Sequence, residues 1–166
     1  MLTARSEATD YVEANDAERG VAYFCRGCKQ PAIFKAGRVK CRHFSHQPGS
    51  KCAYGAKMSP EHLAAQLLLA KTLRERGAEV QLEAHMASLE GDRRIDVLAS
   101  PKGRPDARIA IEVQMSDITV ELIDARTTSY QAEDIAPLWL RLYDFGKWSD
   151  PQMLTDRRTI WIEKHY

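Results

Sequence analysis

The sequence has no hydrophobic run that reaches the roughly 18 consecutive apolar residues that indicate a membrane-spanning helix. We therefore expect no transmembrane helix and no membrane partner. The opening residues, Met-Leu-Thr-Ala-Arg-Ser-Glu, contain no apolar signal-peptide core, which favours a cytoplasmic protein. No internal repeat or low-complexity segment is present, and the length suits one domain, or one domain with a small module.

The sequence also has almost no net charge. Its 24 lysines and arginines nearly cancel its 23 aspartates and glutamates, which leaves +1. The composition as a whole therefore does not indicate nucleic-acid binding, and any basic surface must be local. With 44% hydrophobic and 28% charged residues, the chain has enough apolar content to bury a core.

Cysteine is scarce, and all four cysteines lie within residues 1–57. In a cytoplasmic protein, cysteines serve as metal ligands more often than as disulfides. Cys25 and Cys28 form a Cys-x2-Cys pair, and His43 and His46 follow fifteen residues later. Two thiolates and two imidazoles at this spacing predict a tetrahedral structural zinc site.

Two further cysteines compete for the same site. Cys52 follows His46 by six residues and could replace either histidine. Cys41 would share a strand face with His43, which makes it a second rival. The apolar runs of residues 1–57 are short and broken by glycines, so this segment predicts a module of small β-hairpins that needs zinc to fold.

Residues 58–166 predict a second domain of the α/β (mixed α+β) class. Ser59 is a good N-cap, Pro60 suits the first helical turn, and Gly77 ends the helix that they begin. The pattern then predicts three strands, a helix that begins at Thr119, and two more strands, at 79–87, 93–99, 108–115, 119–132, 137–143 and 159–162. A helix between neighbouring strands indicates a parallel pair within a mixed sheet flanked by helices.

Two of these strands each carry a carboxylate among apolar residues. Asp96 follows Ile95, and Glu112 follows Ile111 in an Ile-Glu-Val-Gln segment that ends at Gln114. Buried acids are costly unless they are paired or bind a metal, so neighbouring Asp96 and Glu112 could hold one Mg²⁺ or Mn²⁺. Asp followed by Glu-x-(Lys or Gln) is the arrangement of the PD-(D/E)xK nuclease fold. Taken alone, the motif favours a simpler interpretation, in which nearby arginines pair with both acids.

Five other residues are candidates for the same site. Glu61 and His62 begin the first helix, where they could face the acidic end of the sheet, and His62 could move a proton. Arg126 and Tyr130 lie one turn apart on the second helix and could hold a phosphate and stack on a base. Arg94 is a candidate phosphate contact. The alternatives are a polar helix start for His62 and a structural ion pair to an acid for Arg126.

Taken together, these segments resemble the competence protein CoiA-like family. The matching residues are Tyr23, Phe24, Cys25, Cys28, Gly37, His43, Phe44, His46, Ser59, Glu61, His62, Arg94, Asp96, Val97, Ala110, Ile111, Glu112, Gln114, Ser116, Ile118, Arg126, Tyr130 and Trp139. The resemblance implies a zinc-ribbon-like module ahead of a PD-(D/E)xK restriction-endonuclease-like domain that handles DNA. The family itself uses a Glu-x-Gln ending.

The sequence departs from that family at the first helix. The family often has a Glu where Met58 stands and a Lys where Gln66 stands. These changes leave two main hypotheses. The first is a metal-dependent DNA endonuclease, with Gln114 orienting the attacking water. The second is a nuclease-fold protein that binds single- or double-stranded DNA, or a DNA-processing protein, without cutting. A zinc-stabilised interaction module with no nucleic-acid role ranks third.

Overall fold

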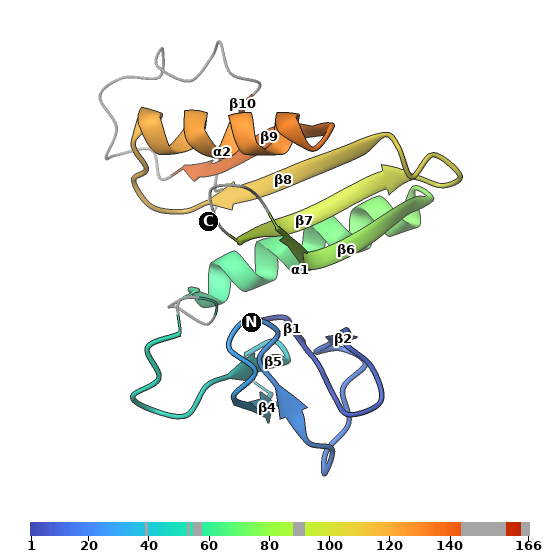
Figure 1. The fold of residues 1–166 in the computed structure, drawn as a ribbon, viewed down its shortest axis with the longest axis vertical. Helices are drawn as coiled ribbons and strands as arrows, with labels where there is room; N and C mark the ends of the chain where they lie inside the picture. Colours follow the sequence, from blue (N-terminus) through green and yellow to red (C-terminus); the bar gives the residue numbers. More distant parts are fainter. Residues whose placement is uncertain (39, 53, 55–57, 88–91, 144–158, 164–166) are drawn as a thin grey trace. The chain divides into compact units, whose positions relative to one another are not determined.

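The computed structural model describes residues 1–38, 40–52, 54, 58–87, 92–143 and 159–163 (Figure 1). The chain divides into two compact units, Met1–Leu67 and Leu68–Tyr166, so the first helix contributes to both. The sequence-based boundary at residue 57 lies just before this helix and stays a prediction. In the described part of the chain, no helix combines the length and apolar character needed to cross a membrane.

The first unit contains two small antiparallel sheets. One joins two short strands and the other joins three, in the order β3-β4-β5. The rings of Tyr23, Phe34 and Phe44 pack with centroids 5.0 to 6.0 Å apart and contribute to its small core. The strands are β1 (Thr3–Ala4), β2 (Val12–Glu13), β3 (Tyr23–Phe24), β4 (Pro31–Lys35) and β5 (His43–Ser45).

The second unit is built on a five-stranded sheet in the order β10-β9-β8-β7-β6 (Figure 1). Strands β6, β7 and β8 are antiparallel, whereas β8 and β10 each pair with β9 in parallel. The predicted mixed sheet is therefore confirmed. The bounds are β6 (Ala78–Met86), β7 (Arg93–Pro101), β8 (Arg108–Gln114), β9 (Ile135–Tyr143) and β10 (Thr159–Glu163).

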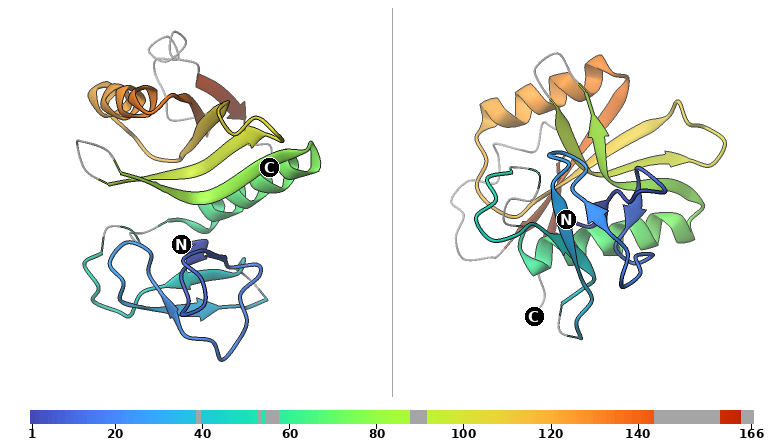
Figure 2. Two further views of the ribbon diagram at one scale, coloured as in Figure 1. Left: turned by 45° about the vertical axis from the view of Figure 1, so that its right-hand side comes forward. Right: turned by 60° about the horizontal axis from the view of Figure 1, so that its bottom comes forward.

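Both predicted helices form, and side chains cap their starts. Helix α1 (Pro60–Glu75) begins after Ser59, whose hydroxyl accepts the backbone N–H of His62 at 3.2 Å. Helix α2 (Val120–Ala132) begins after Thr119, which accepts the N–H of Leu122. Helix α2 lies on one face of the sheet (Figure 2), and its side chains pack in buried clusters with residues of β6 to β9. Because α2 connects the parallel strands β8 and β9, it lies next to the predicted acids.

Candidate functional site

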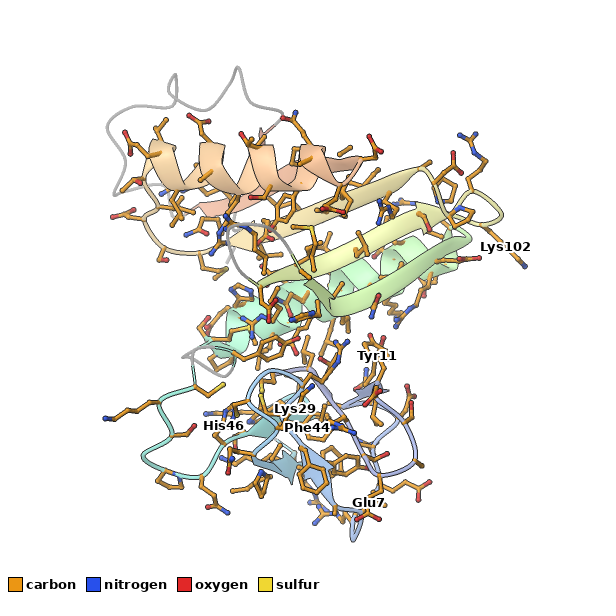
Figure 3. All side chains as sticks on the ribbon, in the orientation of Figure 1. Glu7, Tyr11, Lys29, Phe44, His46 and Lys102 are labelled. Carbon is orange, nitrogen blue, oxygen red and sulfur yellow. The ribbon has the colours of Figure 1, made fainter. Side chains whose placement is uncertain are left out.

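The first unit brings four metal-binding side chains together. The ligand atoms of Cys25, Cys28, His46 and Cys52 all lie within 4.8 Å of one another. The Cys25 and Cys52 sulfurs are 4.0 Å apart, and the Cys28 sulfur lies 3.3 Å from His46 Nε2. Figure 3 labels His46, which follows β5 directly. Cys25 and Cys28 come from a turn, His46 from the end of a strand and Cys52 from a later loop segment.

These donors fit a zinc ion. Ligands at about 2.3 Å around a tetrahedral zinc lie roughly 3.8 Å from one another, which is close to the two distances above. None of the four cysteines, all of which the structure describes, forms a disulfide. Burial raises the pKa of the Cys25 thiol to about 11 when no metal is present. Burial and the N-terminal charge lower the pKa of His46, which favours the neutral ring that can bind a metal.

His43, a first-choice ligand from sequence, does not belong to this group of four. Its ring nitrogen Nδ1 lies 2.8 Å from the Cys41 carbonyl oxygen instead. His43 is held in β5, whereas His46 follows the strand and joins the cysteines. Cys52, the rival ligand, occupies the fourth position.

The turn between Cys25 and Cys28 needs a glycine for a steric reason. A side chain at Gly27 would place its Cβ 2.9 Å from atoms of the Tyr54 ring and from Tyr54 Cβ. The Tyr54 side chain packs against the core of the unit. The backbone closes the turn when Lys29 donates its N–H to the Cys25 carbonyl, with Lys29 at a φ of 63°. The turn is therefore shaped by close packing as well as by its metal-binding cysteines.

In the second unit, Asp96 and Glu112 lie on adjacent antiparallel strands. The β7–β8 register ends where Val97 pairs with Ile111, and Asp96 and Glu112 are the next residues of the two strands beyond that pair. The two residues are only 5% and 4% exposed. Asp96 Oδ2 accepts the backbone N–H of Val113 at 2.9 Å, so its carboxylate reaches across to β8.

The side chains of β7 change face at Asp96. Ile95 packs in the buried cluster that includes α2. Val97, two residues later, should lie on the same face in a regular strand. However, Val97 pairs with Ile111 and so shares its face of the sheet. The neighbour of Ile111, Ala110, points to the other face and packs in the α2 cluster. The alternation therefore breaks between Ile95 and Val97, where Asp96 turns its carboxylate toward β8.

The alternation of side chains along β6 also breaks, at the level of Asp96. Ala84 pairs with Ile95 and packs in the α2 cluster, whereas Leu82 pairs with Val97. Glu83 lies between them, in line with Asp96, and adopts a φ of 46°, which L-residues with a long side chain rarely do. The distortion thus crosses two strands, and an acid occupies the centre of each.

Glu112 is held by two side chains of α2. The Tyr130 hydroxyl donates to Glu112 Oε1 at 2.5 Å, and Arg126 Nη1 lies 3.4 Å from Oε2. Burial, and then the nearby Asp96, raise the pKa of Glu112 to about 8, while Arg126 and the Tyr130 hydrogen bond partly oppose the shift. The same burial and the Glu112 charge raise the pKa of Tyr130. Burial therefore favours the protonated form of this carboxyl when no metal is bound.

This arrangement changes the interpretation of α2. Tyr130, predicted to stack on a base, is only 1% exposed and donates to Glu112, so its ring is not available for stacking in this structure. Arg126 makes the ion pair with Glu112 that the sequence left open as an alternative, and its side chain is 33% exposed. Arg94 pairs with the buried Glu83 at 3.8 Å.

Gln114 ends β8 beyond the acids. Its amide nitrogen donates to the Ser116 carbonyl at 2.6 Å and lies 3.2 Å from the Ser116 hydroxyl. The β8–β9 register places Arg141 opposite it, and Arg141 pairs with Asp117 at 3.1 Å. Gln114 is therefore fixed at the loop that leads to α2.

Glu61 and His62 lie in the first turn of α1, in the first unit. Gln66 is fully buried, and its amide donates to His62 Nε2 at 2.8 Å. The same amide nitrogen lies 3.9 Å from the Met58 sulfur. The two positions that depart from the family pattern are therefore neighbours, and two neutral side chains occupy them together.

Sequence reasoning missed Glu83. Residues 79 to 86 alternate polar and apolar side chains, with Val80, Leu82, Ala84 and Met86 on the apolar side. That pattern assigns Glu83 to the polar face, but the structure buries it completely. An acid next to two apolar residues in a strand was the available signal, and its positive φ could not be read from the sequence.

Comparisons with known proteins agree with this arrangement. Residues 7–55 match the N-terminal domain of competence protein CoiA, and residues 59–153 match its nuclease-like domain. The competence protein CoiA of Bacillus subtilis (strain 168) is 29% identical over 122 residues, which cover 73% of this chain and 31% of that protein. The chain thus spans about a third of the length of this curated relative.

A cysteine–histidine cluster that could hold a metal, and a mixed sheet with a buried acid pair in the region matched by the nuclease-like family model, belong to a nuclease-like protein. With a family model matching more than half of its residues, the chain belongs to the competence protein CoiA family. A crystal structure of a protein of unknown function, AF1548, is also similar, with a TM-score of 0.46 and 17% identity. The match covers 61% of this chain and 58% of that one.

Proposed function

We propose that this protein is a metal-dependent DNA endonuclease, or a DNA-processing protein of the same type, that acts on incoming or foreign DNA. The observation that carries the proposal is the buried pair of Asp96 and Glu112 on adjacent strands. Two neighbouring buried acids repel each other, and a divalent cation between them would remove that cost. A PD-(D/E)xK domain uses its acids in this way.

The donor set suits Mg²⁺ or Mn²⁺. Both ions prefer oxygen ligands, which Asp96 and Glu112 provide, with the Val113 carbonyl as a third candidate. When bound, such an ion supplies an activated water and positive charge beside a phosphate. To serve as a ligand, Glu112 must lose its proton and loosen its contacts with Tyr130 and Arg126.

The remaining residues have supporting roles in this proposal. Gln114 orients the attacking water, although its neutral amide brings no charge. Once it leaves Glu112, the partly exposed Arg126 can bind a DNA phosphate. Glu61 and His62 are candidates for proton transfer. The cysteine–histidine module, with zinc bound, contributes to DNA binding.

The proposal is tested by incubating the zinc-loaded protein with single- and double-stranded DNA in Mg²⁺ and in Mn²⁺. We expect metal-dependent nicking or cleavage that is lost in Asp96→Ala and in Glu112→Ala. Asp106→Ala is a matched control, because Asp106 is an exposed acid of the same unit that pairs with Arg104 in a turn. No cleavage by the wild-type protein in either metal would contradict the proposal.

One observation favours a second function, which is DNA or partner binding without cleavage. Both carboxylate oxygens of Glu112 already contact α2. In addition, Met58 and Gln66 replace a Glu and a Lys with neutral side chains. DNA binding comes mainly from lysine and arginine contacts with phosphates and does not need these acids. Binding that survives both alanine substitutions, without any cleavage, would support this second function.

A further inference from the structure

Glu83 has two unfavourable properties at once. Its side chain is fully buried, although a carboxylate without charge compensation is costly inside a protein. Its backbone φ of 46° lies in the left-handed region, which is strained for a non-glycine residue. Backbone strain of this kind often occurs at functional sites.

One partner of Glu83 is Arg94. Its Nη1 lies 3.8 Å from Glu83 Oε1, and the two side chains are 19% and 0% exposed. The buried carboxylate therefore anchors a guanidinium that still reaches the surface. A guanidinium has five N–H donors in a rigid plane, so one edge can face Glu83 while another faces a ligand.

Arg94 also lies close to the acid pair. It is two residues before Asp96 in β7, and its charge is one of those that lower the pKa of Glu112. Glu83 itself is in line with Asp96 across β6 and β7, at the level where both strands change face. The ion pair and the acid pair thus belong to one distorted region of the sheet.

We propose that Glu83 is a positioning residue that holds Arg94 in place to bind a DNA phosphate beside Asp96 and Glu112. This inference rests on the proposed function. Gln114 brings no positive charge to the site, so Arg94 would add a second guanidinium beside that of Arg126. The planar fork of arginine matches two phosphate oxygens, which a flexible lysine cannot do equally well.

A buried ion pair can also serve stability alone, and a double-mutant cycle separates the two roles. Binding of the zinc-loaded full chain to labelled DNA is measured without Mg²⁺ or Mn²⁺, at several salt concentrations. The proteins are wild type, Glu83→Gln, Arg94→Gln and the double variant. Arg104→Gln is the control for loss of one charge, because Arg104 forms an exposed ion pair with Asp106 in the same unit.

We expect Arg94→Gln to weaken binding roughly tenfold and to reduce the salt dependence by about one phosphate contact. Glu83→Gln should weaken binding several-fold, and the double variant should bind like Arg94→Gln alone. Arg104→Gln should change binding less than either. If Glu83→Gln does not fold, Glu83→Asp replaces it in the same cycle, because it keeps the charge but shortens the reach.

Three outcomes would overturn the inference. They are wild-type binding by Glu83→Gln, independent and additive effects of the two substitutions, and a loss of thermal stability with no change in binding. Cleavage by the wild-type protein is scored separately. Binding without cleavage contradicts the endonuclease function while the cycle still decides the role of Glu83. Cleavage with an additive cycle contradicts only the role of Glu83, and absence of DNA binding contradicts both.

Discussion

At the scale of single residues, Glu112 makes folding depend on pH. Its pKa rises to about 8 in the folded, metal-free protein, from an ordinary value of 4.5. Between these values the folded state binds more protons than the unfolded state, so the free energy of unfolding falls as pH rises. The contribution of Glu112 is complete below about pH 4.5 and is lost as pH rises through 8.

We therefore predict that Glu112→Gln, whose amide resembles the protonated acid, is more stable than wild type at pH 9. The difference should be on the order of 5 kcal/mol at pH 9 and should fall to about 1 kcal/mol at pH 5. Denaturant unfolding of both zinc-loaded proteins at a series of pH values measures this. Because the other titrating groups are common to both proteins, a difference that does not change with pH would refute the prediction.

The zinc ligands provide a second prediction at this scale. The cluster contains His46 and Cys52 but not His43 or Cys41. We expect Cys52→Ser and His46→Gln to lower zinc content well below one ion per chain, because each removes one of four ligands. Cys41→Ser and His43→Gln are the matched controls and should keep one zinc. Metal analysis of the purified proteins decides between the two sets, and zinc loss in His43→Gln would restore the original ligand prediction.

At the scale of elements, α2 matters because it carries both side chains that hold Glu112. Thr119 caps it by accepting the N–H of Leu122 at 3.3 Å. We predict that Thr119→Ala lowers the free energy of unfolding by about 1 kcal/mol. Thr128→Ala, at an exposed position inside the same helix, should be neutral or slightly stabilising, because alanine is the better helix former. Denaturant unfolding compares the two, and equal effects would show that the cap is unimportant.

The order of the elements could be predicted because local signals mark most boundaries. Ser59 and Thr119 start the two helices as capping residues do, and Gly77, at a φ of 83°, follows the end of α1. Strand β9 begins at Ile135, earlier than predicted. The sequence pattern placed the start of this strand at Pro137. This proline is tolerated because β10 pairs with β9 only from Trp139 onward, which leaves one side of Pro137 without a strand partner among the described residues.

The site was less predictable because its details depend on tertiary contacts. Asp96 and Glu112 were found because acids among apolar residues are unusual. The burial of Tyr130 and the positive φ of Glu83 depend on how α2 and β6 pack, which no local pattern records. Likewise, the choice of Cys52 over His43 depends on the direction of a side chain in β5.

At the scale of the whole molecule, the two units have different sources of stability. The first has a small core around three aromatic rings and a four-ligand cluster, whereas the second has a five-stranded sheet. We predict that chelating zinc removes hydrogen-exchange protection from β4 and β5 and leaves most of it in β7 and β8. Structural zinc often provides most of the folding energy of such small modules. Full protection of β4 after chelation, with zinc shown to be gone, would contradict this.

The central claim is that Asp96 and Glu112 together hold one divalent cation. Calorimetric titration of the zinc-loaded chain with Mn²⁺ at pH 8 tests it most directly, because it needs neither DNA nor catalysis. We predict one Mn²⁺ per chain, with affinity lost in Asp96→Asn and in Glu112→Gln and retained in Asp106→Asn. Absence of binding by the wild-type protein, or equal binding by all four proteins, would contradict the account.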